Sequence, residues 1–182
     1  MKITAFFPFI IPVLSIYAAD FDLGGHGVLS VDVPEKWTVN SEPAAKTDGT
    51  QIGYAFAIKP LNDANAKCLL TFAYVNDGKP DQERIRNKVL AACEDFVADS
   101  VEKKKNLKDF SLKQGYGAYC VFTDASLVDK KPKSGDYKVM GSGIVQLSDN
   151  LLGVVSIFAD DVDSKEFKSM IQVINGLIVK AK

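Results

Sequence analysis

The strictest pattern in the chain is an alternation of large and small side chains over residues 51–58. The large side chains are Ile52, Tyr54, Phe56 and Ile58, and the small ones between them are Gly53, Ala55 and Ala57. Successive side chains of a β-strand point to opposite faces, so this pattern predicts a strand with one bulky face and one small face. The bulky face suits a helix lying across it, and the small face allows close approach by another element.

Similar patterns predict further strands along the chain. These strands are expected at residues 28–33, 37–40, 67–75, 109–123, 137–147 and 151–158. The first two should pair as a hairpin, and the strand at 109–123 should bend near Gly115. Residues 67–75 are apolar on both alternating faces, which predicts a central strand that is covered on two sides.

Apolar stripes at helical spacing predict helices at residues 81–105 and 164–179. Asp81 is the expected N-cap of the first helix, and Asp163 begins a capping-box pattern for the second. Lys103–Lys105 would lie in the last turn of the first helix, where cations interact favourably with the helix dipole. We therefore interpret the lysine run as a solvated helix end rather than as a binding patch.

The elements follow the order of four strands, a long helix, three strands and a terminal helix. We expect an α+β fold, an α/β/α sandwich in which two main helices flank a mostly antiparallel sheet of about six to seven strands. Residues 20–182 contain no repeat and no Pro- or Ser-rich linker, which predicts a single domain. The polar segment 129–136 is the expected hairpin loop between two of the later strands.

Residues 1–19 differ from the rest of the chain. Lys2 is their only charge, residues 3–16 are almost wholly apolar, and Ala18–Ala19 end the segment. This arrangement is typical of a secretory signal peptide, with cleavage expected after Ala18 or Ala19. The mature protein should then be secreted or periplasmic, in the bacterial envelope, and should not be an integral membrane protein.

The net charge and the cysteine content exclude further classes of protein function. The 182-residue chain has a formal net charge of −1, so it lacks the basic field that holds nucleic acid. Cys68, Cys93 and Cys120 all fall within predicted regular elements, where buried free thiols are common. An exported chain permits one disulfide among the three, and the sequence does not choose the pair. There is no CxxC motif to indicate a redox or zinc-ribbon site.

No constellation of catalytic residues stands out. His26 is the only histidine, and its glycine neighbours indicate a flexible surface position rather than a general base. Asp160, Asp161, Asp163 and Glu166 are the densest acids, and the first three are weak candidates for a calcium site, but helix capping explains Asp163 and Glu166 without a metal. We therefore predict no metal, no cofactor and no enzymatic activity.

Two segments carry a resemblance to a known fold. Residues 31–37, VDVPEKW, look like a strand–Pro–x–x–Trp motif, and residues 167–171, FKSMI, lead from a sheet strand into a short terminal helix. With the order of elements, they resemble the PsbP-like fold and, within it, the small DcrB-like bacterial envelope proteins. The resemblance implies an exported, non-catalytic helper or binding module. It carries no functional residue onto a numbered position, and members of this fold do unrelated jobs.

Aromatic side chains on the predicted strands supply the candidate binding surface. Its members are Tyr54, Tyr74, Tyr116 and Tyr119, which could face a protein partner or line a pocket. The leading hypothesis is an exported binding module for a protein partner. The alternative is a carrier of a small apolar ligand held between sheet and helix, and a hydrolase-type enzyme is the third.

Overall fold

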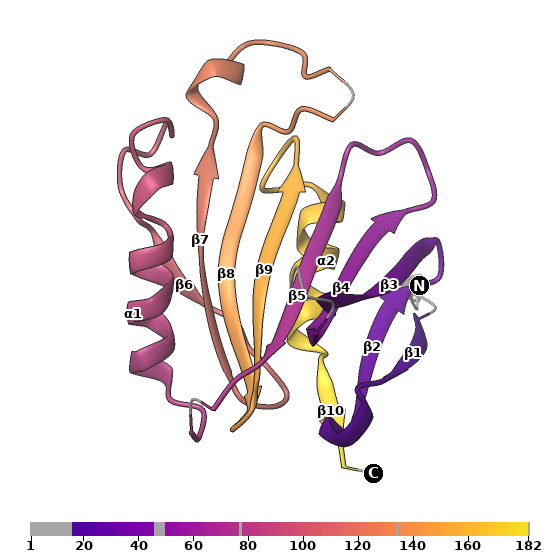
Figure 1. Cartoon of the computed structure of the whole chain (residues 1–182). Coiled ribbons are helices and arrows are strands. Elements are labelled where there is room, and N and C mark those ends of the chain that lie inside the picture. The colour runs from indigo at the N-terminus through magenta and orange to yellow at the C-terminus, as the bar shows by residue number, and fades with distance from the viewer. Residues whose placement is uncertain (1–15, 46–49, 77, 134, 182) are drawn as a thin grey trace, which may run out of the picture.

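The computed structural model describes residues 16–45, 50–76, 78–133 and 135–181, and these form an α+β fold (Figure 1). The strands are β1 (Ile16–Asp22), β2 (Val28–Pro34), β3 (Trp37–Ala45), β4 (Gln51–Pro60), β5 (Lys67–Tyr74), β6 (Leu107–Asp109), β7 (Tyr116–Thr123), β8 (Val139–Ser148), β9 (Leu151–Ala159) and β10 (Ile178–Lys180). The helices are α1 (Gln82–Ala92) and α2 (Lys165–Asn175), with short 3-10 turns η1 (Gly24–His26), η2 (Glu94–Phe96) and η3 (Ala125–Leu127). The expected α+β class, with two helices and a mostly antiparallel sheet, is confirmed, but the structure has a further three-stranded sheet that the sequence did not predict.

The strands form two sheets. The larger has seven strands in the order β3-β4-β5-β9-β8-β7-β6, and every neighbouring pair in it is antiparallel. The smaller has three strands in the order β1-β2-β10. The predicted hairpin of residues 28–33 and 37–40 is wrong, because β2 pairs with β1 and β10 whereas β3 pairs with β4 in the larger sheet.

The two helices pack on opposite faces of the seven-stranded sheet (Figure 1). α2 and the three-stranded sheet lie on the face that holds the main core, where Phe56 and Phe72 are buried. On the other face, Ile85 and Val89 of α1 pack against β7 and β8. The bulky face of β4 meets the three-stranded sheet rather than the expected helix, and Phe21 of β1 contacts Phe56 edge-on with ring centroids 4.9 Å apart.

α1 ends at Ala92, well before the predicted end at Lys105. The chain leaves the helix at Cys93 and folds back, and Lys103 takes a positive φ of 52° that a helix does not allow. The Nζ of Lys105 still donates a hydrogen bond to the carbonyl of Leu90 in the last turn of α1, at 3.2 Å. A lysine in a loop, rather than in the helix itself, therefore places its positive charge at the C-terminal end of α1, where the helix dipole favours a cation.

α2 ends at Asn175 rather than at residue 179, because Ile178–Lys180 pair with β2 as β10. Its N-cap is Ser164 and not the predicted Asp163. The Oγ of Ser164 accepts a hydrogen bond from the amide of Phe167 at 3.1 Å, which satisfies one of the free amides of the first turn.

Only the two ends of the strand predicted at residues 109–123 are in strands: Asp109 is the last residue of β6, and residues 116–123 form β7, which pairs with β6. Gly115 explains the break, because its φ of +78° favours glycine and a Cβ atom there would lie 1.9 Å from the carbonyl oxygen of Gln146. Ala118, Cys120 and Phe122 share a face as expected, and that face lies under α1.

Replacing Ser164 with alanine should lower the free energy of unfolding by about 1 kcal/mol, because the Phe167 amide loses its acceptor. Asp163→Ala is the matched control and should cost less than about 0.5 kcal/mol, because Asp163 makes only an exposed ion pair with Lys168. Urea unfolding measures both values. A larger loss for Asp163→Ala would show that Asp163 is the cap.

All three cysteines are free and buried. Cys68 faces the main core, whereas Cys93 and Cys120 lie under α1. Burial raises the pKa of Cys68 to about 12, and burial together with the neighbouring Cys93 thiol raises the pKa of Cys120 to about 12. Because the thiolate is the reactive form, both thiols should be poor nucleophiles in the folded protein.

Iodoacetamide at mildly alkaline pH should therefore leave Cys68 and Cys120 unmodified in the native protein. All three cysteines should react once the protein is unfolded without reductant, as three free thiols require. Peptide mass spectrometry measures both results. Two cysteines that react only after reduction would contradict this expectation and would identify a disulfide.

Candidate functional site

α1 covers only part of its face of the seven-stranded sheet. Its inner side chains, Ile85 and Val89, pack on Ala118, Phe122 and Ile144 of β7 and β8. In the part of the chain that the structure describes, no helix lies over the same face of β4, β5 and β9. This uncovered area is the first component of the candidate site.

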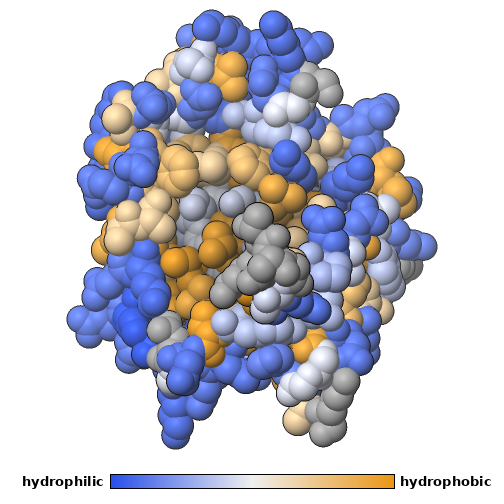
Figure 2. Space-filling model, in the orientation of Figure 1, coloured by the Kyte–Doolittle hydropathy of each residue, from blue (hydrophilic) through white to orange (hydrophobic). Residues whose placement is uncertain are grey.

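We name this area the open face. The antiparallel register places on it the side chains of Ala55, Ala57, Leu69, Thr71, Leu152, Val154, Ser156 and Phe158. Leu69 is 38% exposed and Val154 is 49% exposed. Figure 2 shows a hollow beside α1 in which hydrophobic side chains gather. The open face is therefore largely apolar.

β5 is buried on one face only, so the predicted two-sided cover of residues 67–75 is wrong. Leu70 and Phe72 are fully buried in the main core, whereas Leu69 and Thr71 on the other face are exposed. The solvated face of an antiparallel sheet is usually polar. Leu69 and Val154 are thus exposed apolar side chains on a sheet face where polar ones are usual.

One side of α1 forms a wall of the open face. Arg86 points away from it, toward β6, where its Nε donates to Asp109 at 2.9 Å. Arg84 points the other way, toward β8, and donates to the side-chain oxygen of Gln146 at 2.9 Å. Lys88 follows Arg84 at helical spacing along the same side. Asp81 and Glu83 lie beside these two residues, so this part of the wall carries charges of both signs.

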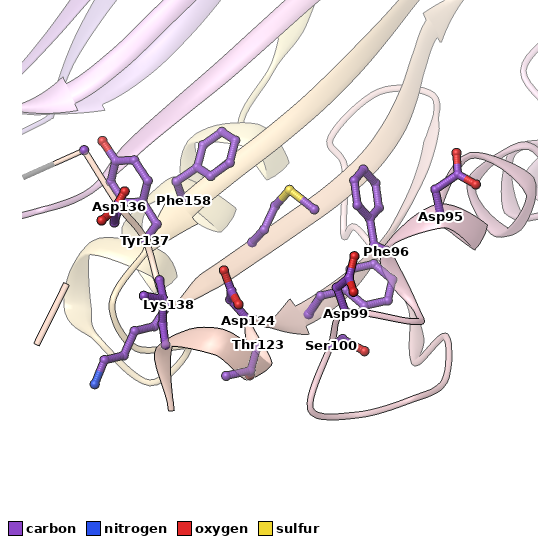
Figure 3. A pocket seen from close by; sticks show the side chains of 14 residues that line it. Asp95, Phe96, Asp99, Ser100, Thr123, Asp124, Asp136, Tyr137, Lys138 and Phe158 are labelled. Atoms are coloured by element: carbon purple, nitrogen blue, oxygen red, sulfur yellow. The ribbon is translucent and has the colours of Figure 1, made fainter. Parts of the chain in front are cut away.

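A pocket of about 390 Å³ lies beyond the C-terminal end of α1 (Figure 3), lined by η2, by the connection between β7 and β8, and by β9. Its aromatic side chains are Phe96, Phe122, Tyr137 and Phe158, and its acidic side chains are Asp95, Asp99, Asp124 and Asp136. In Figure 3 the rings of Phe96 and Phe158 flank this aromatic pocket, and the carboxylates of Asp99 and Asp124 lie along one side. Phe158 also belongs to the open face, so the two areas are continuous.

The aromatic pocket carries an excess of negative charge. Its four carboxylates face one lysine of the lining, Lys138. A second ammonium group, that of Lys67, lies 5.0 Å from the ring centroid of Tyr137 and 5.2 Å from that of Phe158. The rings of Tyr137 and Phe158 thus already make a cation–π contact with Lys67 of the chain itself. Four carboxylates and two ammonium groups leave a net charge of −2, which favours a positively charged group with an apolar stem.

The four tyrosines predicted as a binding surface do not come together. Tyr54, Tyr74 and Tyr119 lie on the main-core face, and burial raises the pKa of Tyr74 and of Tyr119 above the usual value. Tyr116 lies on the opposite face, at the start of β7, and is 46% exposed. None of the four lines the aromatic pocket. Their role in binding stays a prediction.

His26 has neighbours of its own on the main-core side. It stacks on Tyr74 with ring centroids 3.7 Å apart, and its Nδ1 lies 3.0 Å from the side-chain nitrogen of Asn150. A phenol ring and an amide do not activate a nucleophile in the way that a hydrolase requires. The absence of catalysis nevertheless stays a prediction.

The candidate calcium ligands are held by separate contacts. Asp160 accepts a hydrogen bond from Asn65 at 2.9 Å, Asp161 accepts one from the amide of Asp163 at 2.8 Å, and Asp163 pairs with Lys168. Among the described residues, no group of three or more His, Cys, Asp or Glu side chains is placed to hold a metal ion.

No protein-family model matches the chain, and no curated protein matches it. The resemblance to PsbP-like proteins therefore stays a prediction, and the function must be argued from the open face and the aromatic pocket. Across the described ranges, neither helix is long and apolar enough to cross a membrane.

Sequence reasoning missed the aromatic pocket, because its rings come from separate segments. Phe96 follows α1, Tyr137 ends a polar loop, and Phe158 belongs to β9. The open face did leave a signal in the sequence. The small side chains of residues 51–58 predicted close approach by another element, and Ala55 and Ala57 lie on the open face.

Arg86 lowers the pKa of Asp109, chiefly through its hydrogen bond to the carboxylate. A carboxyl group with a lowered folded-state pKa stabilises the fold above its unfolded-state pKa of about 4, and this contribution is lost as the pH falls through the folded-state value. Asp109→Asn should therefore lower the melting temperature slightly at neutral pH and have no effect at strongly acidic pH.

Thermal unfolding followed by circular dichroism across this pH range measures the effect, with Glu83→Gln on α1 as the control. A loss of stability in Asp109→Asn that persists unchanged at strongly acidic pH would contradict the ion-pair explanation.

Proposed function

We propose that this protein is an exported, non-catalytic binding module that binds a protein partner on its open face. The observation that carries the proposal is the exposure of Leu69 and Val154 on a sheet face that no described helix covers. Apolar surface in water is unfavourable in proportion to its area. A partner that covers the open face removes this area from water, and the gain favours binding.

The aromatic pocket supports the proposal. Binding energy at protein interfaces is concentrated in a few anchor side chains that fill well-packed pockets. A pocket that adjoins the open face through Phe158 offers such a position, and its acidic side chains favour lysine or arginine in the partner.

Two predictions from the sequence agree with the proposal. The signal-like residues 1–19 indicate export, and the PsbP-like resemblance implies a helper or binding module. Cleavage after Ala19 would fall within β1 and would leave Asp20–Asp22 of that strand paired with β2. The open face belongs to the other sheet.

A second function has one observation in its favour. The volume of the aromatic pocket, about 390 Å³, is within the range of small-molecule sites, so a small apolar ligand is the alternative occupant. Four carboxylates around the pocket suit a purely apolar molecule poorly. A partner side chain with an apolar stem and a positive end satisfies both the rings and the acids, and we therefore place protein binding first.

Val154→Glu tests the proposal, because it puts a charge on the open face where a partner would have to desolvate it. Recovery of the bound partner should fall by about tenfold or more, since an unpaired buried charge costs more than the 1.4 kcal/mol that a tenfold change represents. The measurement is native mass spectrometry of the protein isolated gently from its own cells. Val162→Glu, at a 36% exposed position on the loop before α2, is the matched control.

The outcomes separate the candidate functions. A partner that is retained by Val162→Glu and lost from Val154→Glu supports the proposal, provided that both variants keep the circular dichroism spectrum of the wild type. Equal recovery with both variants, or bare protein from the wild type, would count against it. A small mass released only on denaturation would favour the ligand carrier.

A further inference from the structure

We infer that the aromatic pocket binds an aliphatic diamine, with one ammonium group at Asp99 and Asp124, the second at Asp136, and the alkyl chain against the rings between them. The inference goes beyond the proposed function, because it assigns a small-molecule ligand to a site that does not require the open face. Three features of the pocket lead to it: a pair of carboxylates on one side, a pair of rings that can accept a cation, and acids at both ends.

The first feature is the pair of carboxylates of Asp99 and Asp124, which lie along one side of the pocket (Figure 3). The backbone brings their two segments together. Ser100 and Asp124 form an antiparallel bridge, and the amide of Ala125 donates to the carbonyl of Asp99 at 3.0 Å. Like charges on one side of a pocket repel each other, and a cation that binds to both removes the repulsion.

The charge of these two carboxylates is not balanced by a direct ion pair. Among the described residues, neither carboxylate lies within ion-pair distance of a lysine or an arginine. Asp124 accepts a hydrogen bond from the amide of Ser126 at 2.7 Å, but that donor is neutral. The ammonium group of Lys103 donates to a backbone carbonyl instead, and in Figure 3 the side chain of Lys138 extends away from the middle of the pocket. A cation from outside the chain can therefore bind here.

The second feature is the rings. The contact of Lys67 with Tyr137 and Phe158 shows that rings of this pocket accept an ammonium group. Phe96 and Phe122 form a second pair, with ring centroids 5.7 Å apart, and in the described part of the chain no cation lies over either ring. Phe96 is 38% exposed, so a ligand can reach its ring from solvent.

The third feature is the position of acids at both ends of the pocket. Figure 3 shows Asp99 near Phe96 at one end, Asp136 near Tyr137 at the other, and Phe158 between the two ends. A diamine matches this order, because an alkyl chain separates its two ammonium groups. Its two positive charges also balance the net charge of −2 that the pocket has once Lys67 and Lys138 are counted against the four carboxylates.

A lysine side chain of a protein partner would carry the same kind of ammonium group on the same kind of alkyl chain. It differs from a diamine in charge, because a single ammonium group can bind the acids at only one end of the pocket. The affinity of the pocket for a diamine relative to a lysine derivative therefore separates the two sources of the cation.

The test titrates the full protein with diaminopentane at neutral pH and low salt, and NMR follows the methyl signal of Met140, which lines the pocket. The shift of this signal should saturate with diaminopentane, whereas the neutral isostere pentanediol should cause no shift. Asp99→Asn should raise the dissociation constant about two- to fivefold, and Phe96→Leu should raise it by a similar factor. Asp163→Asn removes a matched carboxylate at an exposed position before α2 and should leave the dissociation constant unchanged.

Three results would overturn the inference: no saturable shift with diaminopentane, an equal shift with pentanediol, or equal effects of Asp99→Asn and Asp163→Asn. A lysine derivative with both backbone ends blocked should bind about two- to fivefold more weakly than diaminopentane, because it leaves one end of the pocket unpaired. Tighter binding of the lysine derivative would assign the pocket to a side chain of the partner and would also overturn the diamine.

Failure of this inference can be told apart from failure of the proposed function. A natural partner that Val154→Glu releases, from a protein that does not bind diaminopentane, would keep the open face as a binding surface and reject the diamine site. A protein that binds diaminopentane but carries no partner would keep the diamine site and reject the proposed function.

Discussion

The seven-stranded sheet depends on the packing of Phe72 over Gly153 at its centre. The two residues are directly paired between β5 and β9, and Phe72 is fully buried. A Cβ atom at position 153 would lie 2.7 Å from a ring carbon of Phe72 and 2.9 Å from a methyl carbon of Val145, so only glycine leaves room for both. β5 and β9 join the two halves of the sheet, β3–β5 and β6–β9, which are separated in the sequence by α1. This contact therefore fixes how the halves meet.

The same pairing decides which surface stays uncovered. Because β5 sends Phe72 into the main core, it must turn Leu69 outward on the other face. The segment after α1 is not helical as far as Lys105 and is hydrogen-bonded to the end of β7 instead. The amide of Val101 donates to the carbonyl of Thr123 at 2.8 Å, and this anchorage leaves Phe96 at the aromatic pocket. Residues 93–105, which the apolar spacing predicts as helix, instead help to form the aromatic pocket.

The sequence correctly predicted the features that depend only on the geometry of a single strand. The faces of residues 51–58 follow from the sequence alone, because alternation is a property of the strand itself. The wrong predictions concern segments whose partners are distant in the sequence: Ile178–Lys180 leave a helical pattern to pair with β2, and residues 93–105 leave one to contact β7. The candidate site divides in the same way. The small face of β4 was visible in the sequence, whereas the proximity of Tyr137 and Phe158 across the pocket was not.

Strand stability alone does not account for Ala55 and Ala57. Alanine is depleted in strands, and a β-branched residue on a partly exposed sheet face would stabilise β4 more. Gly53 on the same face has a structural reason, since a Cβ atom there would lie 1.7 Å from the carbonyl oxygen of Phe72. For the two alanines, the proposed partner would supply a reason, because small side chains let it come close enough to bury Leu69 and Val154.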